Sequence, residues 1–242
     1  MADEVDRVEA APERTPSWGL GDAALGFLVG VLLSAVVVGI WAGASGSTQV
    51  TLTAIALGEV GLWVGLVGAP VLASRRKGSR HLGEDFGFLL RPSDSRLGVP
   101  IGIASQLLLI PLVYVPIQWL FGQRDLSGQA QQLIDQAHGA GPLALLAVVL
   151  IVGAPVAEEL FFRGLLLRAL QRRFASSPRA DGWAIAGSSV AFGLAHFELL
   201  QLPGLVLFGA VLGVLAVRTG RLGPGIWAHA AFNAVTVLLL AR

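Results

Sequence analysis

The stretch Ala157-Glu158-Glu159-Leu160-Phe161-Phe162-Arg163-Gly164 places two carboxylates and a guanidinium inside a long apolar segment. Residues 142–152 before it are apolar enough to lie in lipid, where an ionisable side chain is costly and marks a candidate functional site. On a helix, Glu159 and Arg163 are four residues apart with the acid first, so they share a face and can pair. Glu158 lies about 100° around the helix from Glu159, because a turn takes about 3.6 residues. The pattern predicts one paired acid and one acid without a partner on its own helix.

The composition is that of a membrane protein. Of the 242 residues, 54% are hydrophobic and only 14% are charged, whereas soluble domains carry about 25% charged residues. Mean hydropathy is +0.71, and the 31 glycines suit closely packed membrane helices. The chain has no cysteine, which excludes disulfides, thiolate metal sites and a cysteine nucleophile. The sequence predicts an all-α, polytopic transmembrane helical bundle, and the net charge of +1 gives no indication of nucleic-acid binding.

Seven apolar segments are expected to cross the membrane. The predicted spans cover residues 21–42, 50–73, 97–121, 142–166, 183–197, 203–217 and 224–240. Gly61 and Gly65 in the second span form a small-xxx-small pair, which predicts a helix-packing face. Three prolines, Pro100, Pro111 and Pro116, are expected to bend the third span. The polar segment 123–140 is expected to hold a short surface helix.

Basic residues decide the predicted orientation, because cytoplasmic loops of membrane proteins are rich in Lys and Arg. With seven spans, the two termini lie on opposite sides of the membrane. An amino terminus in the cytoplasm leaves only Arg124 and Arg242 outside, while Arg163 belongs to the motif. The remaining basic residues then fall in the tail and in cytoplasmic loops: Arg7, Arg14, Arg75, Arg76, Lys77, Arg80, Arg91, Arg96, Arg168, Arg172, Arg173, Arg179, Arg218 and Arg221. We predict a multi-pass protein of the cell membrane with its amino terminus in the cytoplasm and its carboxyl terminus outside.

Further polar residues occur in the last predicted spans. His196 ends the segment Phe192-Gly193-Leu194-Ala195-His196, and His229 and Asn233 share one helix face. At about 1.5 Å per residue, Glu158, His196 and His229 reach depths that allow them to meet in one cavity in the inner half of the membrane.

Each of these polar residues also has an ordinary structural explanation. A single intramembrane His or Asn can simply bond to a neighbouring helix. The two adjacent acids can belong to a salt-bridged helix end at the membrane surface, since several arginines follow them. Glu59, alone in the second span, is interpreted as structural or as lining a cavity. Glu158, His196, His229 and Asn233 together favour a functional site.

These residue types permit hydrolysis. A carboxylate and a His can activate water as general bases, and a His N–H and an Asn amide can donate to a developing oxyanion. Ser188 and Ser189 lie before His196, but no Gly-x-Ser-x-Gly motif surrounds them. The sequence has no His-Glu-x-x-His motif, although Glu158, His196 and His229 could still form a zinc site.

The ordered motifs resemble those of the CPBP intramembrane protease family, also called Abi or type II CAAX prenyl endopeptidase-like. They are Glu-Glu-x-x-x-Arg at Glu158, Glu159 and Arg163, Phe-x-x-x-His at Phe192 and His196, and His-x-x-x-Asn at His229 and Asn233. The resemblance implies a helical membrane fold with a cytoplasm-facing cavity, and an endopeptidase that cuts near the cytoplasmic side with a glutamate-activated water. It implies that Glu158 and His196 position and deprotonate the water and that His229 and Asn233 form the oxyanion hole. Glu159, Arg163 and Phe192 would support them, and no metal cofactor is required.

The chain is expected to have three parts. Residues 1–17 are expected to be a disordered cytoplasmic tail, and residues 18–141 to hold accessory spans one to three with an interfacial segment at 81–95. Residues 142–242 are expected to hold the catalytic core, spans four to seven.

Two other functions compete with a CAAX-type intramembrane peptidase. One is a non-catalytic bacteriocin-immunity or scaffold protein of the same family, and the other is a proton-coupled transporter, since Glu and His in spans also serve proton relays. The intact motif set favours the peptidase, and the repeated halves that many transporters have are not found. The expected partners are a membrane-associated peptide or protein substrate and the lipid bilayer, with no nucleic acid.

Overall fold

The computed structural model of the chain describes residues 16–46, 51–122, 131, 134–137 and 139–241. Within these residues all regular structure is helical and no strand occurs, which confirms the predicted all-α class. Most of the predicted tail and most of the predicted surface helix in 123–140 lie outside the described residues.

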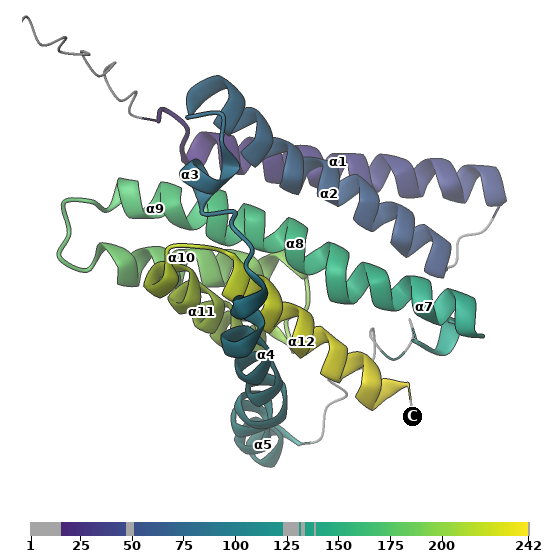
Figure 1. Cartoon of the computed structure of the whole chain (residues 1–242). Helices are drawn as coiled ribbons and strands as arrows, with labels where there is room; N and C mark the ends of the chain where they lie inside the picture. The colour runs from purple at the N-terminus through teal and green to yellow at the C-terminus, as the bar shows by residue number, and fades with distance from the viewer. Residues whose placement is uncertain (1–15, 47–50, 123–130, 132–133, 138, 242) are drawn as a thin grey trace, which may run out of the picture.

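Within the described part of the chain, six helices are long and apolar enough to cross a membrane. Their bounds are Leu20–Ser45 (α1), Leu52–Lys77 (α2), Pro92–Phe121, Ala140–Arg173, Leu202–Thr219 (α11) and Gly223–Leu240 (α12). The seventh predicted span is α10, Ala180–Ala195, with 16 residues. It runs within the bundle between the fourth span and α11 (Figure 1). The expectation of about seven spans is therefore met by six long helices and one short one.

Helices α1 and α2 form a close antiparallel hairpin (Figure 1). A Cβ added to Gly65 would overlap the backbone of Gly26 and Gly30, and one added to Gly61 would meet the backbone of Ser34. Glycines let membrane helices approach this closely, because no side chain separates the backbones. The packing face predicted from Gly61 and Gly65 is confirmed.

The third span, Pro92–Phe121, is not a uniform α-helix. A short 3-10 turn (η1, Pro92–Asp94) leads into α4 (Ser95–Ala104), a π-helical segment (η2, Ser105–Leu109) and α5 (Ile110–Phe121). The predicted interfacial segment before it contains α3, Leu82–Phe86, whose Phe86 is fully buried. Close glycine contacts of Gly98 and Gly102 with Ala228 pack α4 against α12.

The fourth span carries the acidic motif and contains two π-helical segments. It is built from α7 (Ala140–Val148), η3 (Val149–Gly153), α8 (Ala154–Glu158), η4 (Glu159–Leu166) and α9 (Leu167–Arg173). Glu158 is thus the last residue of α8, and Glu159 opens the π-helical segment η4. Short π-helical segments inside α-helices occur frequently at functional sites. In Figure 1 this span lies between the α1–α2 hairpin and α10–α12.

Candidate active site

Glu159 and Arg163 form the predicted ion pair on one face of η4. Arg163 Nη1 donates to Glu159 Oε1 at 2.7 Å, and Arg163 Nη2 donates to the backbone carbonyl of Gly209 in α11 at 3.2 Å. The two side chains are only 0% and 1% exposed. A buried charge is stable only when it is paired and hydrogen-bonded, so these contacts allow Arg163 to lie inside the bundle.

Aromatic rings complete the surroundings of Arg163. Its guanidinium carbon lies 4.3 Å from the centre of the Phe192 ring and 6.0 Å from that of Phe162. The Phe192 ring also makes edge contacts with His196 and His229, with centroid distances of 4.7 and 5.7 Å. Phe192 therefore packs between the arginine and both histidines.

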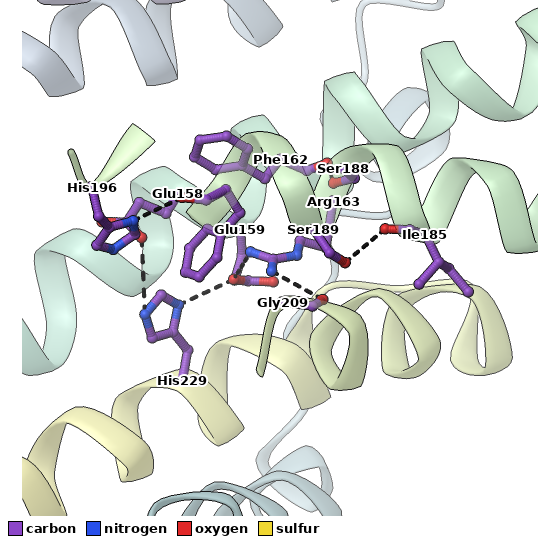
Figure 2. Close-up of polar contacts among 11 residues, drawn as sticks. Glu158, Glu159, Phe162, Arg163, Ile185, Ser188, Ser189, His196, Gly209 and His229 are labelled. Carbon is purple, nitrogen blue, oxygen red and sulfur yellow. Dashed lines mark hydrogen bonds and ion pairs between the residues drawn. The ribbon is translucent and has the colours of Figure 1, made fainter. Parts of the chain in front are cut away.

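His229 connects the two acids, as Figure 2 shows. Its Nδ1 lies 3.1 Å from Glu159 Oε1, and its Nε2 lies 3.9 Å from Glu158 Oε2. An ionised carboxylate can only accept hydrogen bonds, so the Nδ1 atom carries the hydrogen beside Glu159. In a neutral imidazole the lone pair is then on Nε2, on the side of Glu158.

Glu158 has different surroundings from its neighbour Glu159. Its Oε2 atom is buried and has no hydrogen-bond partner, and 3.9 Å to His229 is too long for a hydrogen bond. The absence of a partner on its own helix was predicted from the spacing of the motif. The Glu158 side chain as a whole is 14% exposed and lines a cavity, so its carboxylate can contact a water molecule or a substrate group there.

His196 follows the last residue of α10, and the backbone turns sharply after it. His196 Nδ1 lies 2.8 Å from the carbonyl oxygen of Phe192. A carbonyl oxygen only accepts, so Nδ1 is the donor, and Nε2 of the neutral ring is an acceptor. The next residue, Phe197, has φ +55°, a left-handed conformation that is uncommon outside glycine.

Asn233 lies on α12 one turn after His229 and contacts the fourth span. Its Nδ2 donates to the backbone carbonyl of Leu150 in η3 at 2.7 Å. An amide nitrogen has two hydrogens, so one N–H remains available for another acceptor.

The four predicted catalytic residues, Glu158, His196, His229 and Asn233, line one cavity of about 810 Å³. Glu59 from α2 also lines it, which confirms the interpretation of Glu59 as a cavity residue. The wall is largely apolar and includes Phe208, whose ring lies 5.5 Å from His229 and 4.0 Å from the stacked ring of Phe232. No sequence motif singled out Phe208, since it is one apolar residue of an apolar helix.

The position of the cavity differs from one expectation. It extends from Glu158 toward Leu240 at the end of α12, away from the end of the bundle that carries Arg168, Arg172 and Arg221. A cavity facing the basic loops was expected. The packed side chains of Trp18, Phe86 and Leu222 fill that end instead.

Ser188 and Ser189 are both hydrogen-bonded to the backbone. Ser188 Oγ donates to the carbonyl of Phe162 at 2.8 Å, and Ser189 Oγ donates to that of Ile185 at 2.6 Å (Figure 2). Ser188 thus joins α10 to η4, which agrees with the absence of a nucleophile motif around these serines.

The structure also bears on the geometry of a metal site. In the part of the chain that the structure describes, no group of three or more His, Asp and Glu side chains is placed to hold one metal ion. Glu158, His196 and His229 line the same cavity without forming such a group.

Comparison with known proteins agrees with the motif pattern. Residues 140–235 match the family model described as type II CAAX prenyl endopeptidase Rce1-like. The matched segment is similar to this family. It contains all seven motif residues, and the resemblance found from the motifs is confirmed. Helices α1–α5 lie before the Rce1-like segment.

One curated relative is similar to about half of the chain. It is the Bacillus subtilis (strain 168) protein described as "Putative membrane peptidase YdiL", 28% identical over 123 residues. The similarity covers 50% of this chain and 46% of that protein. The chain therefore spans about half the length of the curated relative it matches. No solved structure matches the chain.

Proposed function

We propose that the protein is an intramembrane endopeptidase that hydrolyses a peptide bond with a water activated by Glu158 and His196. The observation that carries the proposal is the buried, unpartnered Oε2 of Glu158 in the wall of the cavity beside His229. A buried carboxylate without a partner is costly, and at membrane depth it indicates a working group rather than a structural one.

His196 is proposed to share the water with Glu158. Its Nδ1–H is held by the Phe192 carbonyl, so the ring can accept a proton only at Nε2. Two acceptors lining one cavity can orient a water and take its proton as it attacks the peptide carbonyl carbon. The proton then passes to the amine that leaves when the C–N bond breaks.

His229 and Asn233 are proposed to stabilise the oxyanion that forms on the peptide carbonyl oxygen. Because the Nδ1–H of His229 faces Glu159, His229 can donate from Nε2 only as an imidazolium. When His229 is an imidazolium, four neighbouring side chains carry two positive and two negative charges and have no net charge. They are Arg163, Glu159, Glu158 and His229. The second N–H of Asn233 would be the other donor, and each such donor is worth about 2.7–4 kcal/mol in the barrier.

The depth of Glu158 supports a cut in the half of the membrane nearer the basic loops. Glu158 is about 22 Å from the basic end of its span at Arg173 and about 27 Å from the other end at Ala140, at 1.5 Å per residue. With basic loops in the cytoplasm, the cut lies nearer the cytoplasmic side.

The proposed reaction uses side chains and no metal ion. Purified protein should therefore keep its cleavage activity in the presence of a chelator. Stoichiometric zinc in the protein, with activity lost to a chelator and restored by zinc, would contradict this part of the proposal.

The proposal is tested by comparing the membrane proteomes of cells that produce the wild type, Glu158→Ala or Glu84→Ala. Glu84 is an exposed acid on α3, so its replacement is a matched control. New peptide termini should be present with the wild type and Glu84→Ala, while the uncut precursor accumulates with Glu158→Ala. Identical termini in all three strains would reject the peptidase and favour a non-catalytic membrane protein.

A further inference from the structure

The two ends of the helical bundle differ in packing. At the end where α1 begins, which we call the basic end, side-chain and backbone contacts join several of the loops. Leu222 N–H donates to the Gly87 carbonyl at 2.8 Å, and Phe86 packs on Trp18 with ring centres 4.8 Å apart. Phe86 and Leu165 are fully buried there. In the part of the chain that the structure describes, these packed side chains lie between the basic end and Glu158.

Basic side chains form part of these contacts. Arg172 donates to the Pro16 carbonyl at 2.7 Å and lies 3.8 Å above the Trp18 ring. Arg168 donates to the Gly220 carbonyl at 2.9 Å, and Arg221 pairs with Asp94 at 2.7 Å. Lys77 pairs with Asp22 at 2.7 Å. The basic loops predicted to be cytoplasmic are thus gathered at one end of the bundle.

The cavity lies on the other side of Glu158. Along α12 its lining residues run from His229 to Leu240, about 16 Å at 1.5 Å per residue. Along α1 they run from Phe27 to Val38, away from the start of that helix. The α10–α11 turn contributes residues 197, 198 and 201 at the same end.

The charge at this second end differs as well. No Lys or Arg is found among the described residues that line the cavity. The described residues at the far ends of the helices include no Lys and no Arg. They are residues 45–46, 51–52, 118–122, 131, 134–137, 139–140, 196–202 and 238–241. Under the positive-inside rule, this end belongs on the non-cytoplasmic side.

We infer that the cavity admits its substrate from the non-cytoplasmic side of the membrane, although the cut lies nearer the cytoplasmic side. The substrate chain enters at the Leu240 end and extends along α12 to Glu158, a distance that about five residues of extended chain would cover at 3.3 Å each. A largely apolar wall suits the apolar part of a membrane-anchored polypeptide. That a substrate enters the cavity rests on the proposed function, whereas the side of the membrane from which the cavity is accessible does not.

Single cysteines test the inference directly, because the chain has none of its own. Thr236→Cys puts a thiol on the α12 wall between His229 and Leu240, and Ser34→Cys puts one on the α1 wall. Ser176→Cys puts one in the exposed turn between α9 and α10 at the basic end. Intact cells are treated with a membrane-impermeant maleimide, and a second sample is treated after permeabilisation.

We expect Thr236→Cys and Ser34→Cys to show their full gel shift in intact cells, with no further shift after permeabilisation. Ser176→Cys should shift only after permeabilisation. Labelling of Ser176→Cys in intact cells would overturn the orientation. If Ser176→Cys and both cavity variants are labelled only after permeabilisation, the side of access is wrong.

The same labelling in a Glu158→Gln background separates the inference from the proposed function. Access to the cavity does not require catalysis, so the pattern should be unchanged there. A protein without peptidase activity that keeps this pattern would reject the proposed function and retain the inference.

Discussion

Glu158 and Glu159 are adjacent in the fourth span but lie on two helix faces with different surroundings. The paired face carries Glu159 and Arg163, which are 1% and 0% exposed and linked by a 2.7 Å ion pair. The cavity face carries Glu158, which is 14% exposed and has an oxygen without a partner. Two adjacent residues of the same type can therefore have different surroundings, one paired and one without a partner, because they lie on different faces of the helix. Figure 2 shows His229 between the two acids.

The largest effect on stability is expected from Glu159→Gln on the paired face. The substitution removes the charge that compensates Arg163 and one charged contact of His229. Breaking a buried pair in this way costs about 3–5 kcal/mol, because the remaining charge stays buried and uncompensated. The yield of folded protein and the thermal stability in detergent should both fall well below those of the wild type. A Glu159→Gln protein as stable as the wild type would show that the ion pair does not support the fold.

Asn233→Ala tests the oxyanion hole on the cavity face. Loss of one donor should lower turnover by about 10²–10³-fold, or 2.7–4 kcal/mol, with little change in KM. The lost hydrogen bond to the Leu150 carbonyl should cost only about 1 kcal/mol of stability. Thr236→Val is the control, because Thr236 lies one turn further along α12 and its hydroxyl donates to the Phe232 carbonyl. Turnover that is equal in the two variants would remove Asn233 from the mechanism.

Gly209→Ala gives the smallest of these effects. A Cβ at this position would lie 3.1 Å from Ser189 Cα and 3.3 Å from Arg163 Nη2. Such overpacking costs about 1–3 kcal/mol, so the melting temperature should fall moderately.

The matched control for Gly209→Ala is Gly182→Ala in α10, since nothing lies within 4 Å of the added carbon. An alanine there should be neutral or slightly stabilising, because glycine costs a helix about 0.5–1 kcal/mol. Equal melting temperatures for the two variants would mean that contact with Gly209 does not hold Arg163 in position.

Local sequence patterns predicted much of this molecule. Long apolar segments gave the membrane spans, because lipid requires about 20 apolar residues for each helix. The spacing of Glu159 and Arg163 predicted their ion pair, since residues four apart share a helix face. The same periodicity predicted that Glu158 has no partner on its own helix and that His229 and Asn233 share one helix face. Their roles in catalysis stay predictions.

These patterns could not predict the contacts between helices that are distant in the sequence. The approach of His229 to Glu159 and the hydrogen bond from Asn233 to the Leu150 carbonyl depend on how α12 packs against the fourth span. The direction of the cavity depends on Trp18 and Phe86 filling the basic end. Helix periodicity gives the face of a side chain but does not say which neighbour covers that face.

The central claim, that Glu158 is the reactive acid, is tested most directly by the cleavage rate of Glu158→Gln in purified protein. The substrate is a peptide spanning the cut identified in the membrane proteome, and thermal unfolding is measured on the same sample. The substitution preserves side-chain volume and removes no hydrogen bond to Oε2, so we expect wild-type stability and no detectable cleavage. A Glu158→Gln protein that cleaves the peptide at the wild-type rate would contradict the account.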